Sequence, residues 1–414
     1  MSAPTRARAA AIFPGAVAGC ALAGCALACC ALVAPAQGRP PLPPPTGPHS
    51  ISSSRFEWTD ESRPEVADLA RRDARGALRP VPASGARRVI VRVWYPAVSD
   101  ARWVETAPYN AAAASLQGVL RDTARLGIYG STFTHATENR PVVPDARFPL
   151  VVFSPGSGMF AEDYTALLED IASHGFIVAA IAHPGVNLLA FGDGSISGEW
   201  PGWRPPRTLS MSLEPDSLRR SWRFFKARDA YLAADVLFVI RRLMTPGATP
   251  LWESLDTARV GVFGHSTGGA VAAAAATADE RTPIRALLVY DVILPGALYD
   301  QPIPWPFMLM RTTATHYPKG YTERQLETYG HLAADGFDVR LLGAAHQSFT
   351  DRLVLSARTV EGADSAALHL RLIGEYSTAF FSRYLKLEGV PLLDDTTRVR
   401  TGLTLTPFKV TERK

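Results

Sequence analysis

Residues 260–273 read VGVFGHSTGGAVAA and join an apolar run to an alanine-rich run through the turn GHSTG at 264–268. A G-x-S-x-G turn between a strand and a helix is typical of a nucleophilic serine in a strained backbone, with glycines where side chains would collide with neighbouring backbone. Such a turn points the hydroxyl out of the sheet and puts the following N–H groups at a helix N-terminus, where they can stabilise an anion. We therefore predict a nucleophile at Ser266; the alternative is a plain glycine-rich connection.

Strands and helices are expected to alternate along the rest of the chain. Residues 148–153 and 176–181 are continuous apolar runs separated by helical spacing at 163–173. A run that is apolar on both faces indicates a strand buried on both faces, as in a parallel sheet. Further strands are expected at 284–290, 307–310 and 337–342. This alternation predicts an open, mostly parallel sheet with helices on both faces.

A serine hydroxyl needs a general base near neutral pH, and the base needs an acid that orients it. In folds that carry this turn, the acid and then the histidine follow the serine along the chain. Three downstream histidines are candidates for the base: His316, His331 and His346. His331 falls in a helical pattern and His316 in a threonine-rich run, whereas His346 lies directly after the last expected strand. We predict His346 as the base.

Two aspartates are candidates for the orienting acid. Asp291 directly follows the expected strand 284–290, whereas Asp300 lies in a proline-rich loop nine residues further on. We predict Asp291 as the acid; the alternative is that it only caps a turn.

The oxyanion donors are expected in two loops. One backbone N–H follows the nucleophile, at Thr267, and the other comes from the loop after an earlier strand. Residues 154–158, SPGSG, form that loop, and Gly156 allows the backbone to turn its N–H groups inward. We predict the N–H groups of Ser157 and Thr267 as the donors; the alternative at 154–158 is a plain turn.

Composition excludes several classes of protein. Apolar residues make up 47% of the chain and charged residues 20%, which excludes a mostly disordered chain. The formal charge of +4, without a long basic run, gives no electrostatic footprint for nucleic acid. All four cysteines lie between 20 and 30, which excludes a disulfide scaffold, a cysteine-ligated metal site and a cysteine nucleophile in the rest of the chain.

The N-terminus has the pattern of an export signal. Arg6 and Arg8 precede an almost uncharged apolar run at 9–33, and small residues follow at 34–36. We expect cleavage after 36 and a secreted or periplasmic protein. One alternative is a lipoprotein acylated at Cys25, and another is an uncleaved membrane anchor, since 25 apolar residues can span a bilayer.

The expected boundaries place a proline-rich linker and extension at 37–86, a catalytic domain at 87–400 and a tail at 401–414. The segment 184–226 interrupts the strand–helix rhythm, and long irregular segments are often binding loops or lids. We predict a role in substrate binding, and the alternative is that its aromatic side chains only pack the insertion onto the body. The predicted binding residues are Trp200, Trp203 and Trp222.

Several blocks of the sequence resemble the plasma-type platelet-activating factor acetylhydrolases. They are 148–154 with its glycine loop, 172–180, 264–270, 303–307 and 346–349. Asp291 follows Ser266 by 25 positions and His346 follows Asp291 by 55, spacings that are similar to those of the family. The likeness covers roughly residues 88–389.

This resemblance implies an α/β-hydrolase fold, with a mostly parallel central sheet and helices on both faces. It implies a secreted, calcium-independent serine esterase that hydrolyses short or oxidised acyl chains at the sn-2 position of glycerophospholipids. Ser266, His346 and Asp291 would form the triad, and no metal or organic cofactor is implied. The expected partners are a phospholipid or other lipid ester and, peripherally, a lipid surface, without nucleic acid.

Two positions depart from the family pattern. Pro155 stands where the family usually has histidine, and Thr267 stands where it commonly has phenylalanine. The second change removes an aromatic wall beside the oxyanion site, so the substrate class stays open. The alternative is a general secreted carboxylesterase or a cutinase-like or dienelactone-hydrolase-like polyester hydrolase. A catalytically silent fold used for binding is a third hypothesis, and the intact triad counts against it.

Overall fold

The computed structural model describes residues 42–99, 106–107, 109–110, 116, 123–203, 215–278, 281–294, 302–313, 320–394 and 401–408. The expected signal at 1–36, together with Asp300 and His316, lies outside these residues. Within the described part of the chain, no helix is both long and apolar enough to cross a membrane.

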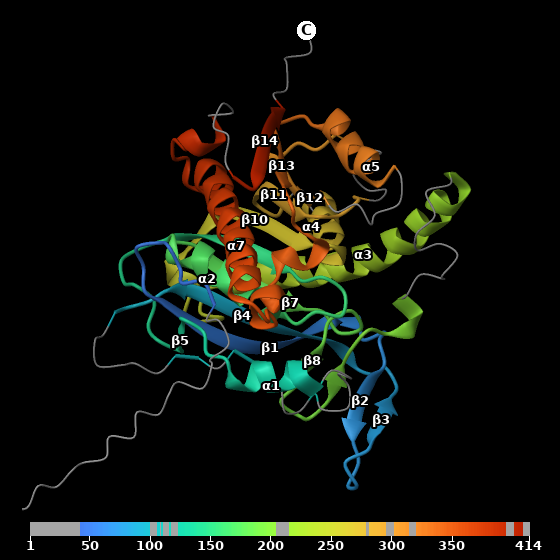
Figure 1. Cartoon of the computed structure of the whole chain (residues 1–414). Coiled ribbons are helices and arrows are strands. Elements are labelled where there is room, and N and C mark those ends of the chain that lie inside the picture. The colour runs from blue at the N-terminus through green and yellow to red at the C-terminus, as the bar shows by residue number, and fades with distance from the viewer. Residues whose placement is uncertain are drawn as a thin grey trace, which may run out of the picture. The chain divides into compact units, whose positions relative to one another are not determined.

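A ten-stranded sheet runs through the molecule in the order β14-β13-β12-β11-β10-β6-β7-β4-β1-β5 (Figure 1). The six central strands, from β13 to β7, are parallel to one another. β14 pairs antiparallel with β13, and β4 pairs antiparallel with β7 and with β1, while β1 pairs parallel with β5. The mostly parallel sheet expected from the sequence is therefore confirmed. The strands are β1 (Ile51–Pro64), β4 (Ala86–Pro96), β5 (Thr137–Glu138), β6 (Phe148–Ser154), β7 (Ile177–Ala182), β10 (Leu255–His265), β11 (Ile284–Tyr290), β12 (Phe307–Thr312), β13 (Gly336–Leu341) and β14 (Leu403–Phe408).

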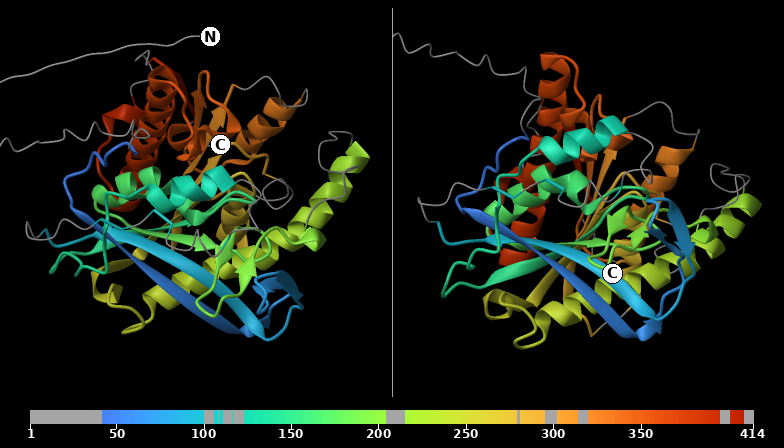
Figure 2. Two further views of the ribbon diagram at one scale, coloured as in Figure 1. Left: turned by 60° about the horizontal axis from the view of Figure 1, so that its bottom comes forward. Right: turned by 90° about the horizontal axis from the view of Figure 1, so that it is seen from below.

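Helices cover both faces of this sheet, as the two views of Figure 2 show. On one face, α3 (Pro215–Met244) and α4 (Thr267–Ala278) bury side chains such as Leu150 and Val262. On the other face, α2 (Thr165–Ser173) and α7 (Val360–Phe381) bury the strand side chains that point toward them. Alternate residues of one strand enter opposite clusters, because successive side chains point to opposite faces. This layered arrangement is an α/β-hydrolase fold.

Smaller elements surround the layers. A second sheet has the order β3-β2-β9-β8. Its strands are β2 (Leu69–Arg72), β3 (Leu78–Val81), β8 (Leu189–Ala190) and β9 (Ile196–Ser197). The remaining α-helices of the described residues are α1 (Thr123–Ser131), α5 (Tyr321–Glu327) and α6 (Arg352–Leu355).

The sheet extends beyond the catalytic range of 87–400 expected from the sequence, which corrects both boundaries. β1 lies within the expected extension, yet it pairs with β4 along most of its length. β14 lies within the expected tail, yet it pairs with β13 over six residues. Both strands carry polar side chains because they lie toward the edges of the sheet, where part of each strand is exposed. The hydrophobic signal of a strand buried on both faces is therefore missing.

The segment 184–226 is also more regular than expected. It contains β8, β9, a 3₁₀ turn at Pro201–Trp203 and the first part of α3, while residues 204–214 lie outside the described residues. Two of its strands belong to the small sheet rather than to a loop.

Candidate active site

Ser266 lies in a tight turn between β10 and α4, as the sequence predicts. Its φ of 54° is in the left-handed region, which costs a non-glycine residue free energy. The glycines on either side are required by close backbone approach: a Cβ at Gly264 would lie 2.2 Å from the carbonyl oxygen of Gly268, and one at Gly268 would lie 1.9 Å from that of Ser154. The strain and the two close approaches hold the half-buried Ser266 at the carboxyl end of β10.

Sheet pairing brings Asp291 to the same edge. The Ser266 N–H donates to the Tyr290 carbonyl at 2.9 Å, and Asp291 follows Tyr290 in a second left-handed conformation with φ 45°. Its N–H donates across to the Met310 carbonyl at 2.8 Å. Asp291 is therefore held in the sheet edge beside the serine turn and is almost fully buried.

His346 and Asp291 are in direct contact. His346 opens a short 3₁₀ turn after β13, and its Nδ1 lies 2.9 Å from Asp291 Oδ2. The Asp291 carboxylate also accepts long hydrogen bonds from the N–H and Oγ1 of Thr312, both at 3.3 Å, and from Gln325 Nε2 at 3.4 Å. A carboxylate on Nδ1 sets the imidazole tautomer that carries its proton there, which leaves Nε2 to act as a base.

The ring of His346 also packs against the residue that precedes the serine. The centroids of His265 and His346 are 4.4 Å apart, with the planes tilted by 39°. This contact places His346 beside the serine turn. The structure gives the Ser266 hydroxyl no hydrogen bond to another described residue, and such catalytic hydrogen bonds are often formed only when substrate is bound.

His265 is held neutral beside His346. The Tyr164 hydroxyl accepts the Gly156 N–H at 3.0 Å and lies 2.8 Å from His265 Nδ1. Burial, and then the neighbouring His346, lower the pKa of His265 well below its usual range. A second positive charge next to the base is thereby avoided.

The two predicted oxyanion donors lie in adjoining loops. β6 and β10 are paired, with Ser154 opposite Gly264, so the loops after them leave the sheet at the same edge. In the first loop the N–H groups of Gly156, Gly158 and Met159 are bound within the protein. Among the described residues, the N–H groups of Ser157 and Thr267 have no such partner. Both amides are therefore available to an anion.

The aromatic segment, residues 184–226, contacts the oxyanion loop, residues 154–158, through an acidic residue. Ser157 Oγ donates to Glu199 Oε1 at 2.7 Å, and Trp200 follows Glu199. Trp200 packs edge to face on Trp203, with centroids 5.5 Å apart. Trp203 in turn packs on Tyr231 of α3, so part of its role is structural. The side chain of Trp222 lies outside the described residues.

The sequence analysis missed several residues that contact the site. Thr312 and Gln325 hold Asp291, Tyr164 binds the oxyanion loop, and Glu199 holds Ser157. Thr312 ends β12, two residues beyond the strand expected at 307–310, and the end of a strand is a position where such a contact could have been anticipated. The other three come from helices or turns whose place relative to the site depends on tertiary packing. The described residues include no group of three histidine, cysteine, aspartate or glutamate side chains that could hold a metal ion.

The chain is similar to several known proteins. A family model described as platelet-activating factor acetylhydrolase, isoform II, matches residues 81–186. The platelet-activating factor acetylhydrolase of Canis lupus familiaris is 26% identical over 330 residues, which cover 72% of this chain and 72% of the relative. That of Bos taurus is 25% identical with the same coverage. A probable 1-alkyl-2-acetylglycerophosphocholine esterase of Arthroderma benhamiae is 23% identical and covers 58% of this chain and 56% of its own.

A solved structure shows the same architecture. A ferulic acid esterase from Streptomyces cinnamoneus superposes with a TM-score of 0.67 and 25% identity, covering 88% of this chain and 97% of that one.

Proposed function

We propose that the substrates of this chain are phospholipids with short or oxidised sn-2 acyl chains. The relatives support the platelet-activating factor acetylhydrolase family, and the chain is a serine ester hydrolase of the α/β-hydrolase superfamily. The observation that carries ester hydrolysis at this site is the contact of His346 with the buried Asp291 beside the strained Ser266 turn. We further propose that the protein is exported through its N-terminal segment and acts without calcium.

In this proposal Ser266 is the nucleophile. Its Oγ attacks the ester carbonyl carbon while His346 Nε2 takes the hydroxyl proton, and Asp291 stabilises the imidazolium that forms. The N–H groups of Ser157 and Thr267 stabilise the oxyanion of the tetrahedral intermediate. The intermediate collapses, the lysophospholipid leaves with the proton from His346, and the acyl group stays on Ser266. Water then attacks the acyl-enzyme with His346 as base, which releases the acid and restores the serine.

Access to lipid substrate is proposed to involve the aromatic segment. Glu199 accepts a hydrogen bond from Ser157 Oγ, and Trp200 follows Glu199 in the chain, so the segment contacts the loop that holds Ser157. In α3, Arg223 and Lys226 are exposed beside the half-buried Phe224 and Phe225. Aromatic rings and cationic side chains together suit a lipid–water interface.

The test is a set of steady-state rates on a series of acyl lengths. We expect kcat/KM on phosphatidylcholines to be highest for an acetyl or oxidised short sn-2 chain and to fall as the chain lengthens. Chelation of calcium with EGTA should leave these rates unchanged. Ser266→Ala should abolish them, and a fluorophosphonate probe should label Ser266. Phospholipid rates that stay low at every acyl length, with fast hydrolysis of soluble aryl esters, would reject the phospholipid assignment.

A general carboxylesterase is the second candidate. The likeness to a ferulic acid esterase over 88% of the chain favours it, as does Thr267, where an aromatic residue would narrow the acyl site. This candidate predicts that aryl esters are preferred over every phospholipid in the same series.

A further inference from the structure

The peptide between Gly156 and Ser157 carries one of the two proposed oxyanion donors, so its orientation decides whether the donor is usable. The Gly156 carbonyl accepts hydrogen bonds from Asn187 Nδ2 at 2.8 Å and from the Met159 N–H at 3.2 Å. In a trans peptide the C=O and N–H groups point in opposite directions. Holding this carbonyl toward Asn187 therefore turns the Ser157 N–H to the opposite side, where it has no partner among the described residues.

The Asn187 side chain has a single consistent orientation. Its Oδ1 accepts the His183 N–H at 2.9 Å, while its Nδ2 donates to the Gly156 carbonyl. Since a backbone N–H can only donate and a carbonyl can only accept, exchanging Oδ1 and Nδ2 would break both hydrogen bonds. Asn187 itself is fully buried, and its N–H donates to the His183 carbonyl at 2.9 Å.

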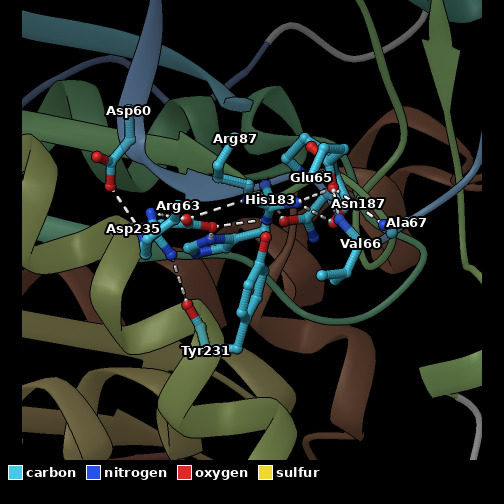
Figure 3. A network of polar contacts seen from close by, with 12 residues as sticks. Asp60, Arg63, Glu65, Val66, Ala67, Arg87, His183, Asn187, Tyr231 and Asp235 are labelled. Carbon is cyan, nitrogen blue, oxygen red and sulfur yellow. Dashed lines mark hydrogen bonds and ion pairs between the residues drawn. The ribbon is translucent and has the colours of Figure 1, made fainter. Parts of the chain in front are cut away.

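A buried charge network holds the turn that carries Asn187 (Figure 3). His183 Nδ1 lies 2.9 Å from Asp235 Oδ2, and Arg87 binds both oxygens of that carboxylate, at 3.1 and 2.7 Å. Arg87 also donates to Glu65 Oε1 at 2.8 Å and to the Pro184 carbonyl at 3.2 Å. The guanidinium therefore ties α3 and β4 to the turn after β7.

The same network reaches the strand before the oxyanion loop. His183 Nε2 lies 3.2 Å from Ser154 Oγ, and Ser154 is the last residue of β6. Ser154, His183 and Asp235 are each at most 1% exposed, so no substrate reaches them. These three residues support the loop at 154–158 and do not form a second reaction centre.

We propose that Asn187 is a positioning residue that presets the oxyanion hole by fixing the peptide plane between Gly156 and Ser157. The inference rests on the proposed ester hydrolysis at Ser266. Rotation of this peptide plane would put the Gly156 carbonyl in the place of the Ser157 N–H, and the hydrogen bond from Nδ2 opposes that rotation. Asn187 contacts neither the nucleophile nor the base, so its effect passes through the Ser157 N–H alone.

The experiment compares Asn187→Ala and Asn187→Ser with Ser197→Ala. The serine variant is too short to reach Gly156 but keeps a hydroxyl in the buried site, which makes the substitution less disruptive than an apolar one. Ser197 is the matched control, because its Oγ accepts the Gly185 N–H at 2.7 Å in the same region without touching Gly156. Rates on a soluble aryl ester, inhibition by a trifluoromethyl ketone and thermal unfolding are measured for each.

A trifluoromethyl ketone adds to the serine and leaves an oxyanion in the hole, so its inhibition constant reports the donors directly. We expect both Asn187 variants to lose roughly 10- to 100-fold in kcat, with a similar rise in the inhibition constant and little change in KM, somewhat less than removal of a donor outright. The Ser197→Ala variant should stay near wild type in both measurements.

Three outcomes would overturn the proposal. The first is near-wild-type kcat and inhibition in a folded Asn187 variant. The second is a loss of kcat without weaker inhibition, and the third is an equal loss in Ser197→Ala, which would mean that the region is only structurally disturbed. Failure of the proposed function is distinguished by the wild-type protein: if a fluorophosphonate does not label Ser266, the reaction itself has been misassigned.

Discussion

The chain holds a second set of serine, histidine and aspartate besides Ser266, His346 and Asp291. In each set the histidine Nδ1 lies 2.9 Å from an aspartate oxygen. In the buried set Nε2 also lies 3.2 Å from Ser154 Oγ, whereas the Ser266 hydroxyl has no hydrogen bond to another of the residues that the structure describes. By hydrogen bonding alone, the buried set is the more complete of the two.

Access and backbone conformation separate the two sets. The His346 side chain is 27% exposed, whereas that of His183 is 1% exposed. Ser266 lies in a strained turn at a helix N-terminus, near two amides that have no partner among the described residues, whereas Ser154 is the last residue of a strand. Asp235 also binds two arginines, so its charge is already balanced. Three residue types in contact therefore make a reaction centre only where substrate and oxyanion donors can reach the serine.

Replacing each serine is the strongest test of this comparison. Ser266→Ala should lower kcat by roughly 10⁵-fold or more, because the residue would be the sole covalent nucleophile. Ser154→Ala should keep kcat within about tenfold, since it removes one neutral hydrogen bond of a buried network. Esterase rates with a soluble aryl ester and labelling by a fluorophosphonate measure both effects. Labelling of Ser154 in the Ser266→Ala protein would contradict the assignment of roles.

Replacing each aspartate gives the next largest difference. Asp291→Asn should lower kcat on the order of 10⁴-fold, because an amide favours the wrong tautomer of His346. Its thermal unfolding should change little, which a melting curve can check. Asp300 is the competing acid predicted from the sequence, so Asp300→Asn is the control variant. A greater loss of rate in Asp300→Asn than in Asp291→Asn would mean that Asp300 is the acid that orients His346.

Asp235→Asn should damage stability instead of chemistry. Removing this carboxylate leaves Arg87 buried beside Glu65 with part of its charge uncompensated, and breaking a buried pair costs about 3–5 kcal/mol of unfolding free energy. The kcat of the folded fraction should stay within about tenfold of wild type. Denaturant unfolding and active-site titration separate the two quantities; an unchanged unfolding free energy would mean that the network contributes no net stability.

The same variant should change the response to acid. Burial by itself raises the pKa of Asp235, but the Arg87 charge and the hydrogen bond from His183 outweigh it and hold the pKa well below its usual range. A lowered folded pKa contributes stability that is fully present above the unfolded value of about 4 and is lost as pH falls below it. The wild-type protein should therefore lose unfolding free energy below about pH 4 more steeply than Asp235→Asn. If the unfolding free energies of the two proteins fall in parallel with pH, the acid sensitivity belongs to other carboxylates.

The two tryptophans should give the smallest effects. Trp203 packs on Tyr231 and lies over Arg87, with the guanidinium carbon 5.8 Å from the ring centroid, so Trp203→Ala should lower thermal stability. Trp200→Ala should lower hydrolysis of phospholipid vesicles a few-fold and leave a soluble ester near wild type, since one ring is only part of the apolar area that would bind a lipid surface. Equal losses on both substrates would make Trp200 structural.

The hydrophobic pattern of the sequence predicts the central strands well, because strands that are buried on both faces are continuously apolar. The apolar runs at 148–153 and 176–181 match β6 and β7 closely, since both faces of these strands are buried. The edge strands β1 and β14 carry no such signal, because one side of each is partly solvated. Their place in the sheet depends on pairing with β4 and β13, which local composition does not encode.

The sequence alone determined the serine turn and the order of Ser266, Asp291 and His346 along the chain. The GHSTG turn is a local feature, and the glycines that flank Ser266 are required by contacts with nearby backbone, which a short motif records. Tertiary structure alone decided which serine, histidine and aspartate set is accessible, and which amide faces the reacting atoms. The hydrogen bond from Asn187 to Gly156 spans 31 residues and that from His183 to Ser154 spans 29, and both depend on the way that neighbouring strands and turns pack. Burial and peptide orientation are properties of that packing, so no short pattern of residues contains them.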